Sequence, residues 1–121
     1  MQSLTRIRKR DRLAAIANFS TRSLNSVSAR VLQRIQTTVI NGEYDVTVHA
    51  VEEMAEDGLD IFDVEAAIAN GQVTKIETDD PRGACYTIVG TAMDERTRVG
   101  VVGRFKETGV FLIITVYAVT E

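Results

Sequence analysis

The stretch from Val46 to Gly71, VTVHAVEEMAEDGLDIFDVEAAIANG, decides the fold and contains the chain's one histidine. Polar and apolar side chains alternate over residues 45–48, which predicts a short strand. Residues 50–57 suit a helix, and Gly58 interrupts the helical pattern. His49 therefore stands where an extended segment becomes a helix, and we expect its ring to lie just ahead of that helix.

A second helix is predicted after Gly58. The side chain of Asp60 can accept a hydrogen bond from the amide of Asp63, as an N-cap residue does. The apolar residues at helical spacing in this segment are Ile61, Val64 and Ile68. Gly71 is expected to end the helix in the left-handed conformation. One strand followed by two short helices with a glycine corner is thus the predicted centre of the domain.

The chain is predicted to consist of a basic N-terminal arm, residues 1–27, and a folded domain, residues 28–121. Ser28 is expected to begin a helix whose apolar stripe contains Ile35 and Val39, and Asn41-Gly42 is expected to end it. The opposite side of this helix is polar and suits solvent. The apolar stripe therefore needs a sheet on which to pack.

Four strands are predicted after the central stretch, over residues 73–77, 85–90, 98–105 and 110–119. Asp80-Pro81-Arg82-Gly83 has the composition of a type I turn, which favours a hairpin between the first two. The last segment is almost wholly apolar, which favours a central position in the sheet. The predicted fold class is α+β, with N-terminal helices packed on an antiparallel sheet of four to five strands, the fifth being 45–48.

Charge is distributed unevenly along the sequence. Residues 1–40 carry eight basic side chains against one acidic, a net charge of +7, and residues 41–121 carry six against sixteen, a net charge of −10. An acidic body repels phosphate, which argues against nucleic acid as a partner of the domain and leaves RNA only to the arm or a local basic patch. The sequence has no apolar run long enough to span a bilayer and no signal-peptide pattern, so we expect a cytoplasmic protein with no membrane partner.

Several motifs in this order resemble a family known as domain of unknown function 4258. The element HA-x-x-E-M-x-x-D-G-[ILV] is matched by His49, Ala50, Glu53, Met54, Asp57, Gly58 and Leu59, and D-V-x-x-A-I-x-x-G by Asp63, Val64, Ala67, Ile68 and Gly71. VVGRF at 101–105 and IITVY at 113–117 resemble the family's ending. The resemblance covers residues from 30 to 120 and leaves the arm out.

Members of that family look like relatives of the RelE-like and BrnT-like ribonuclease toxins of bacterial toxin–antitoxin pairs. The resemblance implies a toxin-like α+β fold and a cognate antitoxin as partner. This chain has an acidic body, and it has Glu53 and Asp57 where many members have arginines. The first hypothesis is therefore a partner-binding component of a toxin–antitoxin-type system. The second is an active ribonuclease, and the third is a structural homodimer joined through the N-terminal helices, with the basic arm lying on the partner's acidic body.

The ribonuclease hypothesis names His49, Arg104 and Tyr117 as catalytic residues, with Lys75 as a further candidate to assist. An imidazole titrates near neutrality and can exchange a proton with a ribose hydroxyl or a leaving oxygen. Arg104 and Arg98 have the same parity on one predicted strand and can face one side. Alternative interpretations stay open: His49 capping helix amides, Arg104 paired with an acidic residue of the neighbouring helix, and Tyr117 a core or rim aromatic.

No metal site and no cofactor are predicted. His49, Glu52 and Glu53 have helical spacing, but zinc sites generally use more His or Cys than this sequence offers. The sequence has no glycine-rich phosphate loop, and Gly100 and Gly103 lie inside a predicted strand, where close packing or a bulge accounts for them. Cys85, in an apolar run, is expected to be buried and unreactive.

Overall fold

A computed structural model describes residues 26–120 of the chain. The chain separates into two units between Arg34 and Ile35, and this division falls within a helix. The described part of the first unit, residues 26–34, is helical. The predicted basic arm lies almost entirely outside the described residues, so its proposed boundary and role stay predictions. The second unit holds the whole sheet and the two helices of the central stretch.

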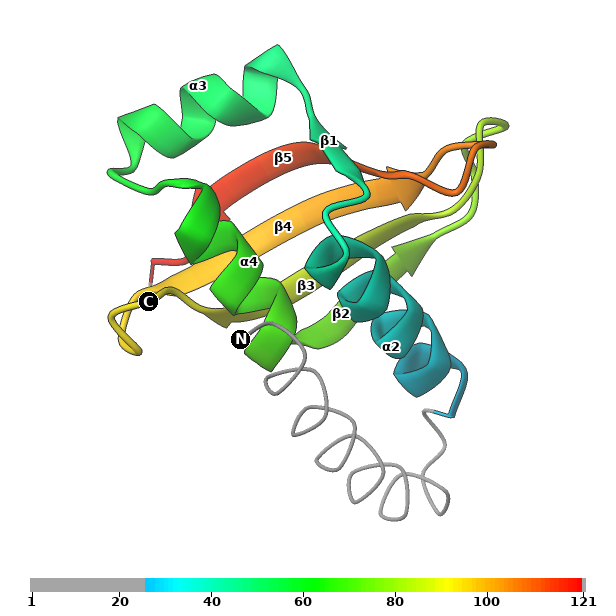
Figure 1. Ribbon diagram of the computed structural model, residues 1–121, viewed down its shortest axis with the longest axis horizontal. Helices are drawn as coiled ribbons and strands as arrows, with labels where there is room; N and C mark the ends of the chain where they lie inside the picture. The colour runs from blue at the N-terminus through cyan, green and yellow to red at the C-terminus, as the bar shows by residue number, and fades with distance from the viewer. Residues whose placement is uncertain (1–25, 121) are drawn as a thin grey trace. The chain divides into compact units, whose positions relative to one another are not determined.

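The order of elements confirms the α+β class (Figure 1). The helices among the described residues are α2 (Ser26–Ile40), α3 (Val48–Glu56) and α4 (Ile61–Asn70), and the strands are β1 (Tyr44–Val46), β2 (Gln72–Glu77), β3 (Cys85–Thr91), β4 (Arg98–Phe105) and β5 (Phe111–Ala118). Every predicted strand is present with its ends shifted by two residues or fewer. The predicted turn at Asp80 also forms, since the amide of Gly83 donates to the carbonyl of Asp80 at 3.0 Å.

The five strands form one sheet in the order β1-β5-β4-β3-β2. Strands β2 to β5 are antiparallel neighbours, as predicted. The prediction of a wholly antiparallel sheet is wrong at one edge, because β1 pairs in parallel with β5, Tyr44 lying opposite Phe111. The connection permits parallel pairing, because α3, α4 and three strands lie between β1 and β5 and no hairpin constrains their direction.

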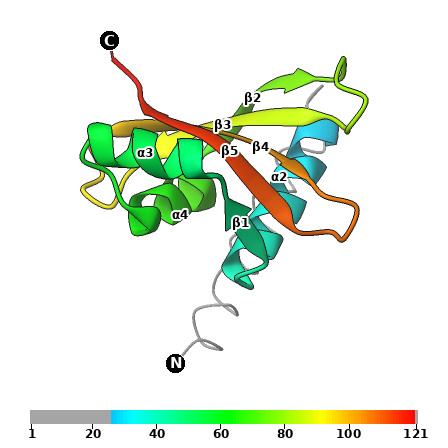
Figure 2. The same cartoon turned by 90° about the horizontal axis from the view of Figure 1, so that it is seen from above.

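Alternation along the strands gives the sheet two different faces. One face carries fully buried side chains, namely Ile88, Val99, Val101, Phe111, Ile113 and Val116. Burial of a side chain of this size contributes about 1.5–3 kcal/mol. We call the opposite face the helix-free face, because the helical segments of residues 35–120 lie over the buried face or along the sheet edge (Figure 2).

Helix α4 lies across β3 and β4. The predicted cap is confirmed as a full capping box: Asp60 accepts from the amide of Asp63 and Asp63 accepts from the amide of Asp60, each at 3.0 Å. The predicted left-handed stop at Gly71 is wrong, since its φ is −92°. Glycine is required there for space, because a Cβ on Gly71 or on Gly90 would overlap the carbonyl oxygen of Ala67.

The end of α2 is tied to α4 through Gln36. Its buried side-chain amide donates to the carbonyls of Ile68 at 3.0 Å and Ala69 at 3.1 Å, near the C-terminal end of α4. These carbonyls have no partner within the helix, so the glutamine satisfies groups that burial would otherwise leave unpaired. Ile35 and Val39 are buried, and Gly42 adopts a φ of 77° just after α2, as the sequence predicts.

Candidate functional site

Thr47 begins α3. Its hydroxyl accepts a hydrogen bond from the amide of Ala50 at 3.1 Å and donates to the carbonyl of Ile114 at 3.1 Å. Ile114 is the extra residue of a bulge between β4 and β5, so Thr47 fixes both the helix start and the irregular point of the strand. The prediction that His49 precedes the helix and caps its amides is therefore wrong: α3 starts at Val48, and Thr47 is the cap.

Helix α3 lies along the outer edge of β5, beyond the point where β1 ends (Figure 1). Glu53 Oε1 accepts a hydrogen bond from the amide of Val116 at 3.0 Å, and Asp57 Oδ2 accepts from the amide of Ala118 at 2.9 Å. In a longer sheet these amides would bind the carbonyls of another strand. Two carboxylates spaced four residues apart thus replace a neighbouring strand, and they seal this edge against pairing with another chain.

His49 lies one turn before Glu53. Its Nε2 atom is 3.1 Å from Glu53 Oε2, and 66 % of its side chain is exposed, against 24 % for Glu53. Glu53 therefore uses one oxygen for the β5 amide and the other for the imidazole. A carboxylate in this position orients the ring, and an oriented, exposed imidazole is the arrangement of a general acid or base.

Tyr117 lies on the helix-free face. It pairs with Gly100 of β4, and its ring covers that glycine so closely that a Cβ at Gly100 would overlap it. The side chain is 37 % exposed, which fits the rim position that was one of the predicted alternatives.

Arg104 lies on the same face and pairs with Leu112. Its charge acts on the β2–β3 turn, where Asp80 accepts a hydrogen bond from Nη2 of Arg82 at 2.9 Å. The side-chain and backbone hydrogen bonds from Arg82 lower the pKa of Asp80 to about 2, and the positive charge of Arg104 adds a smaller effect. The alternative pairing of Arg104 with Glu53, Glu56 or Asp57 is not formed among the described residues, and Glu53 and Asp57 bind β5 amides instead.

These positions bring two of the three predicted residues to one end of β5. His49 is linked through Glu53 to Val116, the residue before Tyr117. Arg104 lies four residues along β4 from Gly100, the partner of Tyr117, which corresponds to about 13 Å of strand. His49 and Tyr117 therefore flank the same sheet edge, whereas Arg104 lies towards the other end of the helix-free face. Their catalytic role stays a prediction.

Two residues of this region, Glu53 and Asp57, were not predicted as partners of the sheet. The signal was present in the sequence, because residues 49, 53 and 57 repeat every four positions and so form one line along a helix. Such spacing shows that the three side chains share a side of α3. It does not reveal that this side meets backbone amides rather than a metal ion or an arginine.

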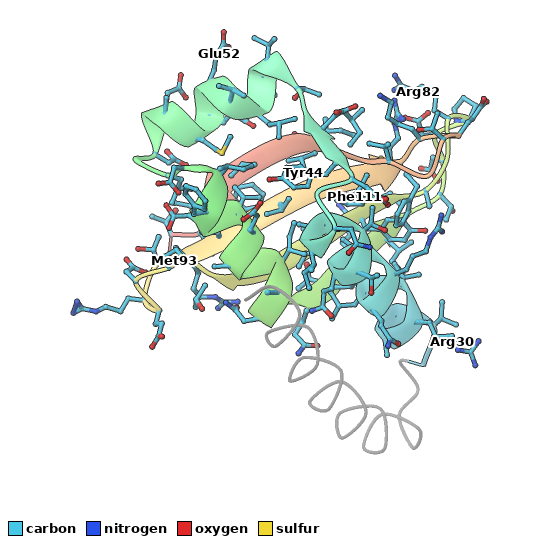
Figure 3. The ribbon with its side chains drawn as sticks, in the orientation of Figure 1. Arg30, Tyr44, Glu52, Arg82, Met93 and Phe111 are labelled. Atoms are coloured by element: carbon cyan, nitrogen blue, oxygen red, sulfur yellow. The ribbon has the colours of Figure 1, made fainter. Side chains whose placement is uncertain are left out.

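The outer side of α3 forms a second surface, which we call the α3 ridge: Val48, Val51, Glu52 and Glu56. Val48 is 74 % exposed and Val51 50 %, and Glu52 points away from the sheet (Figure 3). Within residues 26–120, Glu52 and Glu56 form no ion pair or hydrogen bond through their carboxylates. Residues 43–74 contain nine acidic side chains and no Lys or Arg, so the ridge lies in an acidic region.

The cations of residues 41–121 lie elsewhere. All six Lys and Arg residues of 41–121 occur between positions 75 and 106. Strand register places Lys75, Arg98 and Arg104 on the helix-free face. The segments that contain α3 and α4 are thus purely acidic, and the sheet carries the positive charge.

Over residues 26–120, no set of three or more His, Cys, Asp or Glu side chains is grouped to bind a metal ion. In the same part of the chain, no helix is both long enough and apolar enough to span a membrane. Cys85 is half-buried and free.

Together, these features define a class of small α+β domain in which a helix seals the edge of a mixed sheet through carboxylates and carries an exposed histidine beside that seal. The family model described as "Domain of unknown function (DUF4258)" matches residues 46–118. The chain belongs to this family, and the match begins at the end of β1 and includes the α3 seal and the whole of β2 to β5. Neither a curated protein nor a solved structure matched the chain.

Proposed function

We propose that this domain is a protein-binding component of a toxin–antitoxin-type system in the cytoplasm, and that it binds its partner through the α3 ridge. The observation that supports this proposal is the composition of the ridge. Val48 and Val51 are exposed apolar side chains, and the nearby carboxylates of Glu52 and Glu56 have no partner among residues 26–120. Exposed valines beside unpaired charges of one sign are typical of a surface that another protein covers.

The contrast with the other side of α3 strengthens the argument. Glu53 and Asp57 are engaged with β5, and Ala50 and Met54 are buried, so this side maintains the fold. The ridge makes no comparable contribution to the fold. A partner segment with basic side chains flanking a small apolar strip, such as a short amphipathic helix, complements it in both charge and polarity.

The test begins with the neighbouring genes: if one encodes a small zinc-finger or helix-turn-helix protein, the two are co-expressed and the purified pair is measured by titration calorimetry. Glu52→Lys should weaken binding by roughly tenfold or more, since it places a cation against a basic partner. Glu107→Lys is the matched control, because Glu107 is also exposed but lies in the β4–β5 turn, and it should leave the affinity unchanged. Equal affinities for wild type and Glu52→Lys would refute the role of the ridge.

A second candidate function is ribonuclease activity, and the pairing of His49 with Glu53 is the observation that favours it. In such a reaction His49 takes the proton of a ribose 2′-hydroxyl, and the 2′-oxygen attacks phosphorus to form a 2′,3′-cyclic phosphate. The P–O5′ bond breaks, and the 5′-oxygen takes a proton from water. Arg104, Tyr117 and Lys75 all lie on the helix-free face, where cations and an aromatic ring suit an RNA strand. The resemblance to RelE-like and BrnT-like toxins that the sequence motifs imply points to the same candidate.

The two functions are separated by purified protein and RNA. An active nuclease should cleave RNA and lose that activity in His49→Ala, while the melting temperature stays within a degree or two, because the ring is exposed. Absence of cleavage, together with normal bacterial growth during expression, would eliminate this candidate and leave the protein-binding proposal standing. The homodimer through N-terminal helices depends on residues outside those that the structure describes.

A further inference from the structure

Strand β2 forms one end of the sheet. Its inner edge pairs with β3, and within residues 26–120 no strand pairs with its outer edge. Most of its side chains are exposed. The opposite end of the sheet is different, because β1 has three residues and the rest of β5 is sealed by Glu53 and Asp57. The outer edge of β2 is therefore where this sheet can accept another strand.

The charges on β2 are arranged symmetrically about Ile76. Lys75 and Glu77 lie on the helix-free face, and their Nζ and Oε2 atoms are 3.4 Å apart. The two side chains are 64 % and 53 % exposed. Ile76 lies between them, faces the other side and is 37 % exposed. A strand with this pattern is electrically complementary to its own reversed copy.

We propose that β2 pairs antiparallel with β2 of a second copy of the chain, about a two-fold axis at Ile76. In this register Lys75 of each copy lies opposite Glu77 of the other, and the two Ile76 side chains meet. Opposite-charge pairs and apolar pairs across antiparallel strands are stabilising. The interface is isologous, as a two-fold dimer requires, and it joins the two sheets into one.

Other registers are less favourable. A shift of the axis by one residue, to Lys75 or to Glu77, places identical charges directly opposite each other, which destabilises the pair. On the N-terminal side of Lys75, the bulge at Thr74 interrupts the regular strand. Among the registers of the regular segment 75–77, the one centred on Ile76 is therefore the most favourable. This interface is separate from the α3 ridge. A test of dimerisation through β2 is therefore independent of the proposed function.

The experiment is sedimentation velocity on the full chain over a range of protein concentrations. Wild type should show a monomer–dimer equilibrium. Lys75→Glu and Glu77→Lys should each raise the dissociation constant by roughly tenfold, because each change converts both opposite-charge pairs into like-charge pairs. An equimolar mixture of the two single variants should associate as wild type does, since it restores opposite charges across the interface. The double variant K75E/E77K should also associate.

The mixture also serves as the control for folding, because two misfolded variants would not restore association. Spectra of isotope-labelled protein should show concentration-dependent amide shifts at residues 75–77 and none on α3. A monomer at every concentration would overturn the proposal. Dimerisation that both single variants retain would overturn it equally, because the dimer would then use another surface.

Discussion

The carboxylate of Glu53 accepts a hydrogen bond from the backbone amide of Val116 at 3.0 Å, although 63 residues separate them in sequence. The same carboxylate holds His49 Nε2 at 3.1 Å. One side chain thus joins the end of β5 to α3 and to the most chemically versatile residue of the chain. The H-A-x-x-E-M-x-x-D-G element is explained by this geometry: Glu53 and Asp57 seal the strand, and Ala50 and Met54 pack below it.

Replacing Glu53 should destabilise the fold more than replacing its exposed neighbour. Glu53→Ala leaves the amide of Val116 without its acceptor at a part-buried site, which costs about 1–3 kcal/mol. Glu53→Gln keeps a carbonyl oxygen and should lose less. Glu52→Ala is the control and should change the free energy of unfolding by less than about 0.5 kcal/mol. Urea denaturation gives the free energy of unfolding of the three variants. Equal stability of Glu53→Ala and Glu52→Ala would contradict the role of Glu53 in sealing the edge of β5.

Asp57 makes the equivalent contact one turn later, closer to the end of the strand. Asp57→Ala should increase hydrogen exchange at the amide of Ala118, because that group loses its acceptor and becomes open to water. The amide of Val101, in the centre of β4, provides the internal reference and should exchange at an unchanged rate in the same sample. Uniform acceleration at both amides would indicate global destabilisation instead of a local seal.

Local patterns in the sequence predicted the elements whose causes are local. The capping box of Asp60 and the turn at Asp80 each depend on residues within four positions of each other, so composition and spacing suffice. The α+β class followed from the order of such elements. The bulge or close packing expected at Gly100 and Gly103 also formed.

Features that depend on distant residues were not predictable in this way. The parallel pairing of β1 with β5 joins residues 44–46 to 111–113, and no local pattern encodes it. Gly71 is a glycine because a Cβ there would overlap the carbonyl oxygen of Ala67, not because its φ is positive, so an ordinary stop signal predicted the wrong φ. Thr47 was overlooked for a different reason: its cap to Ala50 is local, but residues 45–48 were assigned to the strand. Only its second bond, to Ile114, depends on a distant residue.

Two glycines of the sheet should differ in their tolerance of alanine. A methyl group at Gly90 meets the backbone carbonyl of Ala67, which α4 holds in place, so Gly90→Ala should cost about 1–3 kcal/mol or more. At Gly100 it meets the ring of Tyr117, which is partly exposed and can turn away. Gly100→Ala should therefore cost less. Thermal unfolding compares the two, and Tyr117→Ala in the Gly100→Ala background should recover part of the loss; the reverse ranking would contradict the packing.

Tyr44 should make stability sensitive to high pH. Burial, then the hydrogen bond and the charge of Glu65, raise the pKa of its phenol above the ordinary value of 10.0. The folded state therefore holds this proton more tightly than the unfolded chain does, so the stabilisation is complete below pH 10 and is lost as the pH rises towards the folded-state pKa. Tyr44→Phe should show a flatter decline in unfolding free energy above that pH. Parallel curves for the two proteins would show that Tyr44 is not the responsible group.

Asp94 should act at the opposite end of the pH range. Backbone hydrogen bonds from Thr97 and then Arg96, followed by the hydroxyl of Thr97, lower the pKa of its carboxyl group from 3.8 to about 2. A lowered pKa stabilises the β3–β4 turn above pH 3.8, and this stabilisation is lost as the pH falls through about 2. Carbon-detected NMR titration of the carboxyl group follows this directly. Thr97→Ala should raise the pKa of Asp94 because it removes the hydroxyl donor at 2.7 Å, whereas Thr97→Ser keeps that donor and should leave the pKa unchanged. Identical titration curves for the two variants would mean that the hydroxyl has no effect and that the backbone amides alone hold the carboxylate ionised.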